Sequence, residues 1–506
     1  MTTTRLLATP TPAPATIAQV PIAARGGTIS LGLVGQPESL NPISENNPAL
    51  RELRPLLFDT LLQVDPDSAK WRPGLAQGWD FSANGRQVTF HLPQDLKWSD
   101  GSLLTAAAIA EGLQATQHPA LRSFSKFSAP DDQTLVLSFN KIDCGALTTL
   151  ALLPLIPADQ MIASVPPGSG PYVAADWSKN RRTLLLTRNP HYQGQAPYLD
   201  GLTVRFVPES EVDVALSEGQ FDAFGPFEAS VPASLPDYLR DLTYPAPQVT
   251  YIAINFDPKN TEPIHPQVRQ ALVLALDREV ILAEALAGDG QLMAASLLPN
   301  HWAAPKAISP PAYDPETARR LLARAGLADT DRDGWLDLEG RRLELGLRLN
   351  GNNPFHQRLG WLASSYYRDL GLYARAESVP PDSMIDDLFT HDFDLAIYSW
   401  SILPDPDQRL YWLAAENTEG QGLNFTSYNN PQLDDLWAAG VSVAGCSPDA
   451  RSNIYAKAQE ALSQDRPVDF LLTPHRHFLV SGRLLGPDPG PFAPVTWNAT
   501  EWHIQE

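Results

Sequence analysis

Cysteine is scarce in this chain, whose 506 residues include only Cys144 and Cys446. The sequence leaves open whether these two meet, and the simpler interpretation is two small, separately buried side chains. Long apolar runs are also absent, since none approaches the ~20 residues that span a bilayer. The first residues lack the basic start and apolar core of a signal peptide. Residues 1–27 are instead rich in Pro and Thr, and we expect a disordered tether there.

Basic residues are also scarce compared with acidic ones. Lys and Arg number 37 against 58 Asp and Glu, and the formal net charge is -21 at pH 7. A chain so acidic repels phosphate backbones and anionic lipid surfaces, which argues against nucleic-acid binding. Hydrophobic residues make up 43% and charged residues 19%, as in soluble globular proteins. A chain of this length exceeds the span of one core, so two or more domains are expected.

Signatures of common enzymes are missing too. The sequence contains no G-x-S-x-G, H-E-x-x-H, Walker loop or G-x-G-x-x-G. Asp386 and Asp387 are adjacent carboxylates, but neighbours on a helix point in different directions, so we predict that both are solvated.

A β-hairpin followed by a capped helix is predicted between Trp71 and Thr105. Apolar and polar residues alternate from Trp79 to Phe81 and from Val88 to Leu92. Between these runs lies the dipeptide Asn84-Gly85, which suits the positive φ angles of a tight turn. The Thr105 hydroxyl can then cap a helix that begins at Ala106.

A series of strands and helices with β-α-β-α-β order is predicted further on. Its elements are residues 343–349 (strand), 355–370 (helix), 372–379 (strand), 383–389 (helix) and 393–397 (strand). Such a series implies a parallel sheet wound in the right-handed sense. Ligands of these sheets lie beyond the carboxyl ends of the strands, so the loop 398–407 is predicted to face a ligand.

Several short motifs of the sequence resemble those of a known family. They are LAQGW at 75–79, TFHL at 89–92, LKWSDG at 96–101, GSGPY at 168–172, RNPHY at 188–192, PYLD at 197–200, VRQAL at 268–272 and NFTSYNNPQLD at 424–434. Their order is similar to that in the extracytoplasmic substrate-binding proteins of peptide and nickel ABC importers, called family 5. The resemblance extends from Thr28 to about Leu472. Pro93-Gln94-Asp95 departs from it, but only at a surface turn.

The resemblance implies an α/β, two-lobed periplasmic-binding-protein fold of class II. In it, residues 28–54, 166–248 and 472–506 form the core of lobe I. Residues 55–165 form an extra subdomain of that lobe, and residues 249–471 form lobe II. Thr250–Phe256 is then a strand that crosses into lobe II.

Ligand-binding residues follow from the resemblance and from the sheet argument together. They are Asn41, Ile43, Ser44, Asn255, Tyr398, Trp400, Leu403, Asp405 and Asn424. In peptide-binding relatives, a loop resembling W-x-x-D-x-x-D-P supplies an Asp that pairs with the peptide's α-ammonium. Leu403 stands at that position here, which argues against binding of ordinary free-amine peptides unless Asp405 replaces the missing Asp. An alternative role for Asp405 is to cap a helix that begins at Pro406. Tyr398 and Trp400 could line a ligand pocket or pack in the core.

Two sets of residues have the donor atoms of metal ligands. Asp329, Asp331, Asp333 and Asp337 have the alternating oxygen donors of a calcium loop around Gly334. Because Gly340 replaces the final bidentate Glu, a plain acidic turn is the alternative to a weak calcium site. His475 and His477 alternate on a predicted strand, but no further ligands accompany them, which argues against a transition metal.

The functional prediction is a substrate-binding protein of an ABC importer. It would capture a peptide-like or other small solute by closing its lobes, and it would act without a required cofactor. Its partners would be a membrane permease with its ATPase, and the protein itself would be a monomer in the periplasm or at the cell surface. A lipid anchor in the full precursor is one option. The alternatives are a solute-sensing receptor with the same fold and a hydrolase that has recruited it.

Overall fold

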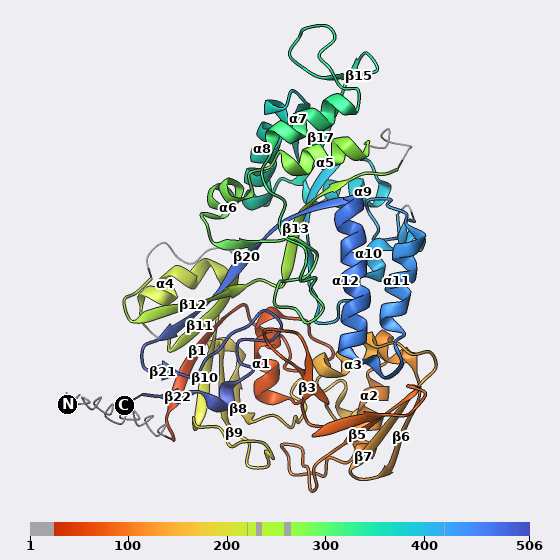
Figure 1. Cartoon of the computed structure of the whole chain (residues 1–506). Helices are drawn as coiled ribbons and strands as arrows, with labels where there is room; N and C mark the ends of the chain where they lie inside the picture. Colours follow the sequence, from red (N-terminus) through yellow and green to blue (C-terminus); the bar gives the residue numbers. More distant parts are fainter. Residues whose placement is uncertain (1–24, 220, 229–234, 258–264, 419, 506) are drawn as a thin grey trace, which may run out of the picture.

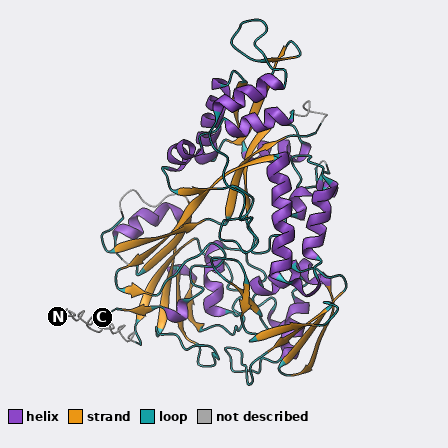
Figure 2. Ribbon diagram, viewed as in Figure 1, coloured by secondary structure: helices purple, strands orange, loops and turns teal. Residues whose placement is uncertain are grey.

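The computed structural model describes residues 25–219, 221–228, 235–257, 265–418 and 420–505, so most of the predicted tether lies outside the described residues. One twelve-stranded sheet runs through the molecule in the order β18-β17-β19-β13-β20-β11-β1-β10-β9-β8, and β12 and β14 also pair with β20 (Figure 1). Helices pack beside this sheet (Figure 2). None of the described helices combines the length and the apolarity needed to cross a membrane.

The lower part of the sheet is built on β1. Its strands are β1 (Thr28–Val34), β8 (Tyr172–Ser178), β9 (Thr183–Arg188), β10 (Gly201–Val207) and β11 (Ala223–Glu228). β1 lies parallel to both β10 and β11. Helix α1 (Pro48–Leu57) begins after Asn47, whose side chain accepts a hydrogen bond from the Ala49 amide. Its apolar face joins β1, β10 and Trp502 in one core, which places the C-terminal tail against this part.

The upper part contains the predicted β-α-β-α-β series. Its elements are β17 (Glu344–Asn350), α8 (Pro354–Asp369), β18 (Tyr373–Val379), α9 (Pro381–Thr390) and β19 (Leu395–Ser401). β17 lies parallel to both β18 and β19, which confirms the prediction of a parallel sheet. Helices α5 (Pro266–Leu274), α6 (Arg278–Leu286) and α7 (Pro315–Arg324) share an apolar core with it.

Two strands connect the upper and lower parts. The crossing strand is β13 (Gln248–Ile254), which pairs with β19 along its whole length. β20 (Val468–Ser481) pairs with β13 near its start. Near its end β20 pairs with β11 and with β12 (Leu239–Pro245). Because β20 belongs to both parts, the sheet is continuous between them.

A smaller sheet contains the predicted hairpin. Its strands are β4 (Gly78–Phe81), β5 (Gln87–His91), β6 (Phe124–Asp131) and β7 (Thr134–Phe139), and helices α2 (Ala106–Ala115) and α3 (Gly145–Leu152) accompany it. Thr105 caps α2, as predicted. The hairpin turn is wider than Asn84-Gly85 alone, since the Ser82 amide donates to the Gln87 carbonyl. Gly85 has a positive φ of 68°, whereas the Asn84 side chain accepts from the Arg86 amide and thereby stabilises the turn.

The two cysteines form a disulfide, so the expectation of separate thiols was wrong. Cys144 precedes α3, and Cys446 lies between α11 (Pro431–Val441) and α12 (Pro448–Asp465). Both side chains are buried, and the Cys144 amide donates to the Val441 carbonyl at 2.9 Å. Tertiary packing of α3 against the α11–α12 turn brings the cysteines together across a sequence separation of 302.

Gly168 and Gly170 are needed for close packing. A Cβ on Gly168 would lie 2.0 Å from the Leu57 carbonyl oxygen, and one on Gly170 would lie 2.5 Å from the Leu57 carbonyl carbon. Neither glycine has a positive φ. Close approach to the end of α1, rather than an unusual backbone angle, therefore requires glycine at these two positions.

Candidate functional site

A cavity of about 720 Å³ lies where the end of α1 faces the end of β19. Its walls come from α1 and the residues after it, from the β12–β13 turn, from residues 401–404 after β19, and from the C-terminal tail. A volume of this size is typical of sites for small molecules. The end of β19 therefore borders a cavity, and this is the edge of the parallel sheet at which ligands are expected.

Leu403 lines this cavity, with 55% of its surface exposed. The other eight predicted ligand-binding residues all lie in described parts of the chain but not in the cavity wall. The wall therefore has an apolar side chain at residue 403 and no carboxylate there.

Charged side chains also line the cavity. Four are arginines, Arg51, Arg54, Arg72 and Arg476, and three are acids, Glu52, Asp59 and Glu501. Burial raises the pKa of Glu52 to about 7, although a hydrogen bond from the Val495 amide opposes that shift. Burial likewise raises the pKa of Asp59 to about 7, opposed by the Ser169 hydroxyl. At neutral pH these two carboxyl groups are therefore only partly ionised.

These four arginines were not among the predicted ligand-binding residues. The available signal was the spacing of Arg51 and Arg54, one helical turn apart on α1, next to the buried Glu52. Arg72 and Arg476 gave no such signal, because their strands come close only in the folded chain.

The family model described as "Bacterial extracellular solute-binding proteins, family 5 Middle" matches residues 70–421, which is more than half of the chain. The chain belongs to this family. It is 25% identical over 498 residues to the oligopeptide-binding protein AppA of Bacillus subtilis (strain 168), covering 91% of this chain and 89% of that protein. It is also 25% identical over 472 residues to the probable D,D-dipeptide-binding periplasmic protein DdpA of Escherichia coli (strain K12), covering 87% of each.

The fold is likewise that of the family. The solved structure of HbpA2 from Haemophilus parasuis matches with a TM-score of 0.80 and 19% identity, covering 95% of this chain and 100% of that one. The predicted two-lobed α/β fold is thereby confirmed. The family consists of extracellular solute-binding proteins, and both AppA and DdpA are described as binding proteins.

In this family 5 chain, the three predicted asparagines are buried and bound to the backbone. Asn41 donates to the Met161 and Ala163 carbonyls and accepts from the amides of Ile43 and Ser44. Asn255 and Asn424 also bind backbone carbonyl groups. Asn255 donates to the carbonyls of His391 and Phe393, and Asn424 donates to those of Leu413 and Tyr428. These side-chain amides tie backbone segments together, and a role in ligand binding stays a prediction.

Tyr398 and Trp400 belong to an aromatic cluster beside the crossing strand. The Trp400 ring stacks on Tyr411 with centroids 4.3 Å apart, and Tyr398 meets Tyr251 edge-on at 4.5 Å. Both residues lie within β19 rather than in the loop after it. Core packing, which the sequence left open as an alternative, describes their contacts.

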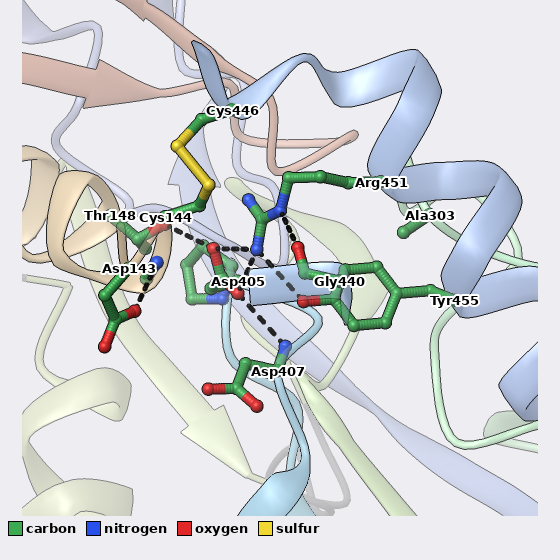
Figure 3. Close-up of polar contacts among 12 residues, drawn as sticks. Asp143, Cys144, Thr148, Ala303, Asp405, Asp407, Gly440, Cys446, Arg451 and Tyr455 are labelled. Atoms are coloured by element: carbon green, nitrogen blue, oxygen red, sulfur yellow. Dashed lines mark hydrogen bonds and ion pairs between the residues drawn. A yellow bond between two sulfur atoms is a disulfide. The ribbon is translucent and has the colours of Figure 1, made fainter. Parts of the chain in front are cut away.

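Asp405 is buried in an ion pair (Figure 3). Its carboxylate accepts from the Arg451 guanidinium at 2.8 and 2.9 Å and from the Thr148 hydroxyl at 3.0 Å. The predicted helix cap was wrong, because the next helix, α10 (Arg409–Trp412), has Gln408 at its N-cap. With its charge already matched by Arg451, Asp405 is not positioned to replace the missing acid at Leu403.

The acidic loop brings together three of its four predicted calcium ligands. Asp329, Asp331 and Asp333 can each offer an oxygen within 4.8 Å of the others, the only such group among the described residues. Asp337 instead accepts from the Thr330 amide at 2.9 Å. Asp333 also pairs with Arg342, which competes with a cation. The donor set fits calcium in its chemistry, but the competing guanidinium and the missing fourth carboxylate predict weak binding.

The remaining predicted groups have protein partners. His477 binds Asp241 through Nδ1 and Asp289 through Nε2, both at 2.7 Å, so both ring nitrogens are engaged. His475 binds Asp289 at 3.0 Å. Asp386 is exposed as predicted, but Asp387 is half-buried and pairs with Arg348 at 3.2 Å, so the expectation that it is solvated was wrong.

Proposed function

We propose that this protein is the substrate-binding component of an ABC importer, and that it captures a small or peptide-like solute in the 720 Å³ cavity. The observation that carries the proposal is a cavity walled by both lobes of a family 5 chain. A solute that contacts both walls favours the closed arrangement by its differential affinity for that state. Neither a cofactor nor covalent chemistry is needed for this step.

Peptide-like ligands are supported by the names of AppA and DdpA, which are described as binding oligopeptides and D,D-dipeptides. Binding of a free α-ammonium group is disfavoured at residue 403, because Leu403 offers no carboxylate. The charge of the nearby Asp405 is already neutralised by Arg451. An unpaired ammonium in a closed cavity is costly. The ligand is therefore expected to lack a free amine at this position or to be a different small solute.

The proposed partners are a membrane permease and its ATPase, which receive the closed form. The protein would act as a monomer in the periplasm or at the cell surface, with a lipid anchor as one means of attachment. Family membership supports this location. A solute-sensing receptor would use the same cavity, so the two roles differ only in the partner. Stimulation of the cognate ATPase in proteoliposomes by the loaded protein supports transport over sensing.

The test of solute binding is native mass spectrometry of the protein purified from its own source, followed by release of any bound molecule. Ala493, which lines the cavity, is replaced by Trp to occupy the space. The matched control is A107W, on the exposed face of α2. We expect wild type and A107W to carry the solute and A493W to lose it. Equal loading of A493W, or conversion of the solute by the protein, would contradict the proposal.

A further inference from the structure

The cavity wall is rich in guanidinium groups, although the protein as a whole has a net charge of -21. Arg51 and Arg54 come from α1, Arg72 comes from β3 (Trp71–Pro73), and Arg476 comes from β20. Residues from three separate elements thus place positive charge around one space. The net charge of an acidic protein does not account for a cluster of arginines, so we attribute the cluster to the ligand.

Arg54 is held in place without being neutralised. Its Nη2 donates to the carbonyls of Pro42 at 3.1 Å and Glu45 at 3.4 Å. These acceptors are uncharged, and no carboxylate of the described residues forms an ion pair with Arg54. Its side chain is half-buried, and both burial and the neighbouring Arg51 lower its pKa. Each of these effects makes an anion beside Arg54 favourable.

Arg72 is positioned in a similar way. Its Nη2 donates to the Gln63 side-chain oxygen at 3.0 Å, and its guanidinium lies 4.5 Å from the centre of the Trp497 ring. Gln63 and Trp497 also line the cavity. Within the described residues no carboxylate lies within ion-pair distance of Arg72, although the charges of Asp65 and Glu501 act on it from farther away and burial outweighs them in lowering its pKa. The contacts orient a planar group whose remaining N–H donors are not matched by a carboxylate.

The acids of the wall only partly offset this charge. Glu52 and Asp59 are buried, and burial raises the pKa of both to about 7, so they carry less than full charge at neutral pH. Glu501 is exposed. Leu403 adds an apolar surface in place of an acid. At or below neutral pH the net charge of the cavity wall is therefore positive. The carboxyl group of Asp59 is a position that would suit a cation.

Building on the proposed solute-binding function, we propose that the ligand is an anion and that Arg54 and Arg72 bind its carboxylate or phosphate group. The forked guanidinium matches the two oxygens of a carboxylate or phosphate, and such charge-assisted hydrogen bonds are stronger than neutral ones. Trp497 and Leu403 supply apolar walls for the rest of the ligand. An acidic peptide without a free amine and a small organic acid share this chemistry.

The test compares probes that differ in charge but little in shape, by thermal shift and calorimetry at pH 7. The peptide probes are N-acetyl-Glu-Glu-Glu-amide, N-acetyl-Gln-Gln-Gln-amide and N-acetyl-Lys-Lys-Lys-amide. Citrate and inorganic phosphate represent other anions. The variants are R54Q and R72Q, and the control is R86Q on the exposed hairpin turn. Because Arg54 also binds the loop that contains Pro42, R54Q can fail to fold. In that case R72Q alone tests the proposal.

We expect at least one anionic probe to bind wild type and R86Q alike, and to bind R72Q at least about tenfold more weakly. Binding of only the neutral or cationic peptide would overturn the anion proposal and leave solute binding intact. Anion binding unchanged in both R54Q and R72Q would overturn it as well. The solute released from the native protein gives an independent readout, since a neutral or cationic solute contradicts the proposal. Complete absence of a bound solute, with no response to any probe, would instead contradict the proposed function.

Discussion

The carboxyl group of Glu52 lies in the cavity wall with 8% of the residue exposed, and burial raises its pKa from 4.5 to about 7. Arg51, Arg476 and the Val495 amide all favour its ionised form, yet burial outweighs them. A carboxyl group whose folded-state pKa is raised stabilises the fold fully below its unfolded pKa. That contribution is lost as the pH rises through about 4.5 to about 7.

We therefore expect E52Q to be more stable than wild type at pH 8, on the order of 1–3 kcal/mol, because Gln never ionises. The Gln oxygen can still accept from the Val495 amide. At pH 4 the two proteins should differ little. Urea denaturation of both proteins across this pH range measures the difference. A gap that does not depend on pH would show that the charge of Glu52 is not its cause.

Asp405 and Arg451 form a buried charge pair directly behind the cavity wall, which Pro404 lines. Arg451 is fully buried, and its guanidinium also lies 5.3 Å from the ring centre of Trp302 and 5.6 Å from that of Trp71. Removing one partner leaves the other charge buried and unmatched, so D405N should cost about 3–5 kcal/mol of unfolding free energy.

Urea denaturation also measures this cost, with T148V as the matched control. That variant deletes the neutral Thr148 donor to Asp405 together with the acceptor of the Trp71 indole N–H, and it should cost about 1–3 kcal/mol. Equal losses in the two variants would mean that the ion pair is no more important than a neutral hydrogen bond.

At the scale of elements, the acidic loop around Gly334 is a candidate calcium site that titration can test directly. Asp329, Asp331 and Asp333 converge, but Arg342 pairs with Asp333 and the predicted Asp337 is bound elsewhere. We expect calcium to bind in the millimolar range, which is weak for a calcium loop. R342A should bind it more tightly, because the competing guanidinium is gone, and D331N should lose it. Calorimetry with calcium and these variants decides the point, and identical titrations of wild type and D331N would exclude the loop as the site.

Local sequence signals predicted many of the elements themselves. The alternation that marks β4 and β5, the Thr105 cap of α2, and the order of β17, α8, β18, α9 and β19 all depend on residues close in the chain. The width of the hairpin turn and the close packing at Gly168 were not predictable, because they depend on contacts with other segments.

At the scale of the whole molecule, the disulfide joins two segments that the sequence analysis had assigned to different lobes. Cys144 lies in the 55–165 segment and Cys446 in the 249–471 segment. Many buried residues of the two segments share one apolar core, and Trp302 donates through its amide to the Ser68 carbonyl at 2.8 Å. Figure 1 shows α11 and α12 extending from the upper part down to the region of α3. Any lobe movement that preserves the disulfide must keep α3 next to the α11–α12 turn.

We expect the C144A/C446A variant to lose about 2–5 kcal/mol of unfolding free energy, since the bond closes a long loop in the unfolded chain. Urea denaturation without reductant compares it with wild type, and wild type with reductant should resemble the variant. An unchanged midpoint would mean that the packing of α3 on α11 and α12 holds this interface without the bond. Ligand binding should persist, because neither cysteine lines the cavity.

The family, the two-lobed fold and the edge of the sheet that borders the cavity were accessible from the sequence, because ordered motifs and the winding of a β-α-β series are properties of the chain itself. Tertiary structure alone decided which side chains line the cavity. It brought Arg72 and Arg476 beside α1, committed Asp405 to Arg451, and joined Cys144 to Cys446. These outcomes depend on distances between segments far apart in sequence. Residue spacing along the chain carries no information about such distances until the sheet and its crossing strands have formed.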